Sequence, residues 1–378
     1  MLKRFEVENF KGFSEKFTMD LSGIKSYEFN DECVKDGVAR FAQCYGPNGS
    51  GKSNFGLAVL DVVCHLTDFN AKTIHYANYL NANSNANATF SYTFKFSKGT
   101  VKYEYSKSSQ STPLREELWI RDELVISLDR ETGNTPFVSL AGAESLILNE
   151  IKNNKISIVK FIAKNSILAK NETNELFADF LDFIDHMLYF RSLQDTSFIG
   201  YKAEKEHIPN YIITNDLLDE FQSFLGKIGI DYKLASIEDS ENDLKSIGVV
   251  FESGKETRTK NFFDIASTGT KALTIFFYWF NKVKSQDRPS LIFIDEFDAF
   301  YHFKLSETVT KMLRGLVKHQ VILTSHNTGL LSNDISRPDC NFIISKNEMY
   351  PLYSLTDKEL RSAHNIEKIY RAGGFGEG

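Results

Sequence analysis

Gly46-Pro47-Asn48-Gly49-Ser50-Gly51-Lys52-Ser53 decides the fold, because it fits the phosphate-binding pattern G-x-x-x-x-G-K-[ST] of the P-loop. The glycines of such a loop let successive backbone N–H groups point at a phosphate. Lys52 is predicted to reach the β- and γ-phosphates of ATP, and the Ser53 hydroxyl to bind Mg²⁺. The sequence therefore predicts a nucleotide site from Gly46 to Asn54. The alternative is a glycine turn with an incidental Lys-Ser pair.

The residues on both sides of the loop strengthen this interpretation. Residues 38–45 are mostly apolar and predict a strand that enters the loop, and residues 54–63 predict a helix that leaves it. Strand, glycine loop and helix in this order is the context that the motif requires.

An acidic pair that follows a second apolar run supplies the partner that the loop needs. Residues 291–294 are Leu-Ile-Phe-Ile, typical of a strand buried on both faces of a parallel sheet. Asp295 at its end is predicted to hold Mg²⁺, and Glu296 to orient and deprotonate the attacking water. The alternative is a strand that ends in a solvated acidic turn.

Two further motifs follow the order of one class of nucleotide-binding proteins. Ser267-Thr268-Gly269-Thr270-Lys271 precedes a helical run, and its Ser267 and Gly269 are predicted to contact the γ-phosphate held by a second protomer. An ordinary helix start is the alternative. His326 follows directly after the apolar strand 320–324 and Ser325, and it is predicted to bind the γ-phosphate or the attacking water. A structural histidine is the alternative there.

The whole chain is compatible with a globular protein of one large domain or two smaller ones. It has 378 residues, 42% of them hydrophobic, and a net charge of −6, which argues against a broadly basic surface for nucleic acid. Its four cysteines lack C-x-x-C spacing and are expected to be free thiols in a reducing cytoplasm. No signal segment is predicted, since the N-terminus has no apolar region of the kind that a signal peptide needs. No membrane span is predicted either, since the longest apolar run, 272–280, is interrupted by Thr274 and is far too short to cross a bilayer.

Periodicity divides the chain into three expected parts: 1–140 with the loop and an antiparallel β subdomain, 141–245 as an inserted helical lobe, and 246–378 as the second half of the core. Alternating apolar and polar residues predict strands at 5–10, 89–96, 101–105, 117–120, 124–128 and 247–252. Apolar residues at three- and four-residue spacing predict amphipathic helices at 143–169, 175–188 and 215–228, and Asn215 is expected to cap the last of them.

The ordered motifs resemble the ABC-type ATPases of the RecF/SMC/OLD-like group. The resemblance rests on Asn9–Phe13, the P-loop, S-T-G-T-K, L-I-F-I-D-E-F-D and L-T-S-H-N. The tail 363–376 resembles the RloA-like branch, AAA-family ATPases of prokaryotic defence islands. The implied fold is α/β, a P-loop NTPase of ABC/SMC-head type with a mixed sheet core, an antiparallel β subdomain and an inserted helical lobe.

This resemblance also implies partners. Two ATP molecules would lie between two head-to-tail protomers of a homodimer or higher homo-oligomer, and a separate effector, such as a nuclease or a toxin, would act beside it. The motif S-T-G-T-K at 267–271 stands where ABC-type ATPases carry their L-S-G-G-Q signature. This difference weakens the prediction of ATP-driven dimerisation. Gln194 is a candidate for the Q-loop glutamine, with a surface glutamine as the alternative. Only 52 residues follow His326, so we expect any nuclease activity in a partner.

Three functions compete at this point. The first is an ATP-hydrolysing switch that controls a partner effector in antiphage defence. The second is a DNA-repair-like ATPase that binds nucleic acid directly, with the lysines of 152–164 as a candidate track. The third is a scaffold that binds ATP without hydrolysing it. A GTPase is disfavoured, because 281–284 reads N-K-V-K where an [NT]-K-x-D segment would be needed.

Overall fold

The computed structural model describes residues 1–378 except 70–75, 192–196, 201–206, 240–243, 255, 285–287, 300, 302, 346–347 and 376–378. Its centre is a seven-stranded sheet in the order β12-β11-β16-β17-β5-β18-β19. The strands are β12 (Ser197–Gly200), β11 (Met187–Arg191), β16 (Leu291–Asp295), β17 (Gln320–Ser325), β5 (Phe41–Tyr45), β18 (Asn341–Ser345) and β19 (Glu348–Pro351). The five inner strands run parallel, so their carboxyl ends meet at one edge.

A second seven-stranded sheet is antiparallel, in the order β10-β9-β8-β7-β6-β1-β2. Its strands are β10 (Phe137–Val138), β9 (Glu123–Asp129), β8 (Thr112–Ile120), β7 (Gly99–Ser109), β6 (Ala88–Phe96), β1 (Leu2–Glu8) and β2 (Phe17–Asp20). The hairpin predicted around Gly99 is confirmed as β6–β7. Alternating burial along β6 and β7 places aromatic side chains inside the core.

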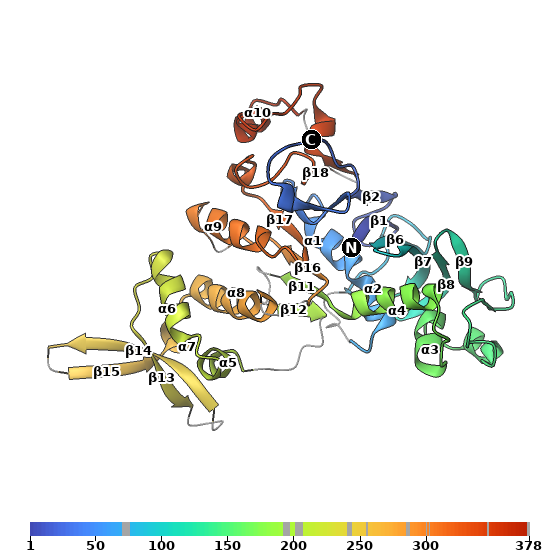
Figure 1. Ribbon diagram of the computed structural model, residues 1–378, viewed down its shortest axis with the longest axis horizontal. Helices are drawn as coiled ribbons and strands as arrows, with labels where there is room; N and C mark the ends of the chain where they lie inside the picture. The colour runs from blue at the N-terminus through green and yellow to red at the C-terminus, as the bar shows by residue number, and fades with distance from the viewer. Residues whose placement is uncertain are drawn as a thin grey trace.

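Ten helices and two small sheets, β13-β14-β15 and β3-β4, complete the described part of the chain (Figure 1). The helices are α1 (Lys52–Val59), α2 (Asp61–Leu66), α3 (Ile158–Asn165), α4 (Glu172–Asp185), α5 (Ile208–Thr214), α6 (Leu218–Lys227), α7 (Phe262–Ile265), α8 (Thr268–Lys284), α9 (Phe303–Arg314) and α10 (Ile366–Arg371). The short strands are β3 (Val34–Lys35), β4 (Val38–Ala39), β13 (Leu234–Asp239), β14 (Leu244–Ser253) and β15 (Glu256–Asn261), and the 3-10 turns are Asp31–Cys33, Leu148–Asn153, Thr328–Leu330 and Leu352–Leu355.

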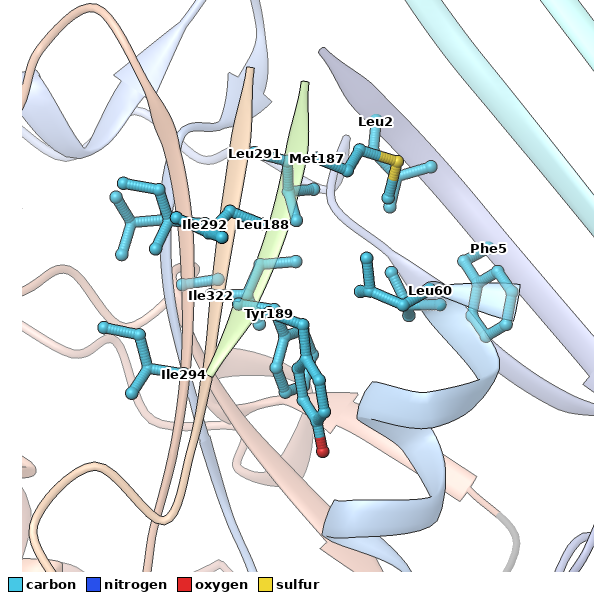
Figure 2. Packing of buried hydrophobic residues seen from close by; sticks show 14 of the residues in the cluster. Leu2, Phe5, Leu60, Met187, Leu188, Tyr189, Leu291, Ile292, Ile294 and Ile322 are labelled. Atoms are coloured by element: carbon cyan, nitrogen blue, oxygen red, sulfur yellow. The ribbon is translucent and has the colours of Figure 1, made fainter. Parts of the chain in front are cut away.

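Helix α1 lies between the two large sheets. A Cβ on Gly56 would come within 2.7 Å of the Tyr189 ring and 2.8 Å of the Phe293 ring, so glycine lets the helix approach β11 and β16. On its other side, Tyr92 of β6 donates a hydrogen bond to the Ala58 carbonyl. Figure 2 shows Met187 and Tyr189 on the face of the central sheet toward Leu60 and Phe5, with Ile292 and Ile294 on the opposite face.

Three expectations about the middle of the chain are wrong. The segment 143–169 is not one helix: it holds the 3-10 turn Leu148–Asn153 and then the short helix α3, which Ser157 caps after an interruption by polar residues. The helix predicted to reach residue 188 ends at Asp185, since the buried run from Met187 forms β11 of the central sheet. Asn215 ends α5 and does not cap α6, and its Nδ2 donates to the Tyr211 carbonyl.

The end of the molecule farthest from the antiparallel sheet is a β arm that was expected only as one strand (Figure 1). Strands β13, β14 and β15 pair antiparallel, and all of β15 before Asn261 is exposed. The fold class, a mixed α/β P-loop domain with an antiparallel β subdomain, is confirmed. The boundaries 1–140, 141–245 and 246–378 stay a prediction.

Candidate nucleotide site

The P-loop connects β5 to α1, and its glycines hold positions that side chains would obstruct. Gly49 and Gly51 have φ of 80° and 95°, in the left-handed region that favours glycine. A Cβ on Gly46 would lie 2.8 Å from the Ile344 carbonyl oxygen and 2.6 Å from Ser50 Oγ. Ser50 Oγ is buried without a hydrogen-bond partner. The loop thus keeps a conformation, and an unsatisfied hydroxyl, that suit a ligand rich in oxygen atoms.

The predicted turn at residues 9–13 packs against this loop. Gly12 lies close to Asn54, because a Cβ there would be 3.1 Å from the amide nitrogen of Asn54. Gly51 likewise lies close to Phe13, because a Cβ on Gly51 would be 3.3 Å from the Phe13 ring. The first residues of the chain therefore support the start of α1, where Ser53 and Asn54 are half-buried.

Lys52 is the buried cation of the site, with 4% of its surface exposed. Its ammonium donates to the carbonyl oxygens of Gly46 at 2.8 Å and Pro47 at 2.9 Å. Desolvation lowers the pKa of Lys52, and the charges of Glu296 and Asp295 act in the opposite direction. A phosphate would supply acceptors in place of the loop carbonyls, which fits the predicted role.

The acidic pair lies at the carboxyl end of β16, as predicted. Asp295 is 4% exposed, and its two oxygens accept hydrogen bonds from Thr324 at 2.7 Å and from the Tyr189 hydroxyl at 3.4 Å. Glu296 has φ of 48°, which is unusual for a residue with a side chain. Its Oε1 lies 3.0 Å from His326 Nε2.

His326 joins the two halves of the site. Its Nδ1 lies 3.3 Å from Lys52 Nζ, and its Nε2 contacts Glu296. An ammonium group can only donate, so Nδ1 is the acceptor and Nε2 carries the hydrogen that faces the carboxylate. The structure thus brings together Lys52, His326 and Glu296 from three distant parts of the sequence. Beside them lies an open pocket of about 480 Å³, lined by Asn48, Glu296, Ala299 and His326.

Two residues of the site were not singled out in the sequence. Asp298 accepts a hydrogen bond from Ser325 Oγ at 2.8 Å, and burial raises the pKa of Asp298. Thr324 binds Asp295 and the Glu296 amide. The second aspartate of D-E-F-D was a visible signal for Asp298, whereas Thr324 lies within an apolar strand that gives no such signal.

Ser267 and Gly269 do not line the pocket beside His326. Ser267 Oγ accepts a hydrogen bond from the Thr270 amide at 3.2 Å and caps α8, as the ordinary helix-start alternative requires. Ser267 and Thr268 are nevertheless exposed, so the cap faces solvent. The contact of Ser267 with a second protomer stays a prediction, and Gln194 lies outside the described residues.

The predicted Mg²⁺ ligands are one hydroxyl and one carboxylate. Both offer oxygen, the ligand that Mg²⁺ prefers, and Mg²⁺ at phosphate sites commonly uses one or two protein ligands. The described ranges contain no group of three or more His, Cys, Asp or Glu side chains that could hold a metal ion. Ser53 and Asp295 therefore fit a metal held jointly with phosphate, and not a metal held by protein alone.

Comparison with known proteins gives the family of the chain. The sequence profile of a family described as "AAA domain, putative AbiEii toxin, Type IV TA system" matches residues 45–332. This match spans about three quarters of the chain and includes the P-loop, the acidic pair and His326. The loop and strand ends define a P-loop nucleotide-binding protein, and the chain belongs to this AAA-domain family. Comparison with curated protein sequences gave no significant match.

Solved structures that match this chain include three heads of SMC proteins. An SMC head bound to the C-winged helix domain of ScpA has 15% identity and a TM-score of 0.46, over 92% of this chain and 96% of that one. The SMC head domain from Thermotoga maritima has 15% identity and a TM-score of 0.41, over 93% and 98%. The Smc head bound to the C-terminal domain of ScpA derived from Pyrococcus furiosus has 14% identity and a TM-score of 0.42, over 92% and 94%.

Among the described residues, no helix is both long enough and apolar enough to cross a bilayer.

Proposed function

We propose that the protein hydrolyses ATP and uses the bound and hydrolysed states as a switch. The observation that carries this proposal is the chain of contacts from Lys52 through His326 to Glu296. It places a cation, an imidazole and a carboxylate at one end of the P-loop, beside an open pocket. A loop that only bound nucleotide would not need a carboxylate held at this position.

Each residue has a role that follows from its chemistry. Lys52 neutralises charge on the β- and γ-phosphates, and Glu296 accepts a proton from the attacking water. The Nε2 hydrogen of His326 holds the Glu296 carboxylate in place before the reaction. Mg²⁺, held by Ser53 and Asp295, would neutralise phosphate charge.

We further propose that the site is completed by a second copy of the chain. The exposed, capped start of α8 would present Ser267 and Gly269 to a γ-phosphate held by the partner protomer. Head-to-tail pairing of two protomers would form two such sites. The motif order and its resemblance to ABC-type ATPases support this arrangement.

The family description supports a role in defence. It names a toxin of a type IV toxin–antitoxin system, which is compatible with an OLD-like or RloA-like ATPase that controls a nuclease or a toxin. Free cysteines and the requirement for ATP support a cytoplasmic location.

Direct nucleic-acid binding receives less support. Lys160 and Lys164 both form ion pairs with Asp68, at 2.9 Å and 2.5 Å, and Lys152 donates to the Gly133 carbonyl. These contacts direct Lys152, Lys160 and Lys164, three of the four lysines of 152–164, toward the protein itself.

ATP turnover by purified protein, with Lys52→Ala as control, tests the proposal. We expect Mg²⁺-dependent phosphate release by the wild type and none above background by the variant. Nucleotide binding without turnover would favour the non-hydrolysing scaffold. Neither binding nor turnover by the wild type would contradict the whole assignment.

A further inference from the structure

The hydroxyl of Thr324 touches both acidic residues of the site. Thr324 lies near the end of β17 and is completely buried. Its Oγ1 accepts a hydrogen bond from the Glu296 amide at 2.7 Å and donates one to Asp295 Oδ1 at 2.7 Å. An amide only donates and a carboxylate only accepts, so the direction of both bonds is fixed.

The backbone of Thr324 adds a third contact. Its carbonyl oxygen accepts a hydrogen bond from the Phe297 amide at 3.2 Å. Thr324 therefore binds three consecutive residues, 295 to 297, where β16 ends. Regular pairing of β16 with β17 stops at Ile294 and Leu323, one residue earlier.

The middle residue of these three has the unusual backbone. Glu296 has φ of 48°, and such a conformation persists where surrounding contacts enforce it. The 2.7 Å hydrogen bond from the Glu296 amide to Thr324 Oγ1 is one of the contacts that enforce this conformation. With the backbone turned in this way, the Glu296 side chain reaches His326.

We propose that Thr324 is a positioning residue for the site: its hydroxyl orients Asp295 toward Mg²⁺ and holds Glu296 in the conformation that meets His326. This inference rests on the proposed ATP hydrolysis and assigns a determinant that the sequence pattern does not reveal. Groups that orient metal ligands typically change affinity or activity about 10- to 100-fold when they are removed.

Two substitutions distinguish the effect of losing the Thr324 hydroxyl from the effect of changing the volume of its side chain. Thr324→Val keeps the shape and removes the hydroxyl, whereas Thr324→Ser keeps the hydroxyl and removes a methyl group. Tyr189→Phe removes the longer 3.4 Å bond to the other Asp295 oxygen and serves as a graded control. Thermal unfolding without ligands identifies the folded variants, and Thr324→Ala replaces Thr324→Val if valine prevents folding.

The measurements are ATP turnover and the affinity of the protein–ADP complex for Mn²⁺, read by electron paramagnetic resonance. We expect Thr324→Val to lower kcat and weaken Mn²⁺ binding about 10- to 100-fold. Its affinity for metal-free ADP should stay within about twofold of the wild type, because the P-loop is intact. We expect Thr324→Ser to stay within about threefold of the wild type in every measurement, and Tyr189→Phe to lose less than Thr324→Val.

Wild-type values for Thr324→Val, or equal losses in Thr324→Val and Thr324→Ser, would overturn the role of the hydroxyl. Absence of turnover in the wild type would instead contradict the proposed function. In that case the Mn²⁺ affinities still compare the variants, and absence of Mn²⁺ binding by the wild type would overturn both proposals.

Discussion

Lys107 Nζ lies 2.6 Å from Asp61 Oδ2, and the exposed fractions of the two side chains are 1% and 0%. Asp61 begins α2, directly after the helix that leaves the P-loop, and Lys107 lies on β7 of the antiparallel sheet. The hydroxyls of Tyr79 and Tyr105 donate to the same carboxylate. A buried ion pair thus fixes α2, the helix next to α1, to the antiparallel subdomain.

Removing one member of this pair should destabilise the fold strongly. Lys107→Met leaves the Asp61 charge buried without its cation, and we expect the free energy of unfolding to fall by about 3–5 kcal/mol. Lys98→Met is the matched control, because its pair with Glu175 is half-exposed on both sides, so solvent screens it and it should contribute little to stability. Denaturant unfolding measures both. Equal effects of the two substitutions would contradict the account.

Acid should weaken the fold through Glu116, which is buried on β8. Burial acts to raise the pKa of Glu116, but hydrogen bonds and charges from His65, Ser157 and Arg130 prevail and lower it from 4.5 to about 2. This carboxylate therefore stabilises the fold above about pH 4.5, by about 3 kcal/mol, and the stabilisation is lost as the pH falls toward 2.

Unfolding measured between pH 7 and pH 3 tests this carboxylate. Glu116→Gln should be less stable at pH 7 and should lose less stability on acidification than the wild type, because it has no carboxylate to protonate. Identical pH profiles of the two proteins would show that Glu116 is not responsible.

Close packing of α1 on the central sheet gives a third prediction. Gly56→Ala should lower the free energy of unfolding by about 1–3 kcal/mol, since the new methyl group overlaps the Tyr189 and Phe293 rings. Gly226→Ala in α6 is the control. Its nearest neighbour would lie 3.8 Å away, and alanine is favoured within a helix, so stability should stay equal or rise by up to about 1 kcal/mol. A neutral Gly56→Ala would contradict this packing.

Complementation tests the composite site. Lys52→Ala removes the P-loop half and Ser267→Arg obstructs the other half, so each variant alone should be inactive. In a head-to-tail dimer, an equimolar mixture that exchanges subunits should regain about a quarter of the wild-type sites, because half of the dimers hold one intact pair. Full activity of Ser267→Arg alone, or no recovery in the mixture, would contradict the role of Ser267.

The sequence predicted the nucleotide-binding elements well because each combines a buried apolar run with a polar residue at its end. The strands that end at Asp295 and Ser325 are of this kind. Strand β11 was missed because it follows α4 with only His186 between them, and a short apolar run does not distinguish a strand from a buried helix.

Other features depend on contacts that sequence order conceals. The residues of β15 before Asn261 are exposed, so that strand has no burial pattern to detect. Asp61 and Lys107 are 46 residues apart and meet only in the folded protein. Thr324 reads as one polar residue at the end of an apolar strand, and its role depends on the turn that Glu296 makes beside it.

Retention of ATP by Glu296→Gln tests the central claim most directly. Glutamine keeps the size of the side chain and cannot accept the proton of the attacking water. After a single addition of radiolabelled ATP and Mg²⁺, we expect the variant to hold unhydrolysed ATP while the wild type holds or releases ADP. Hydrolysis by Glu296→Gln at the wild-type rate would contradict the account.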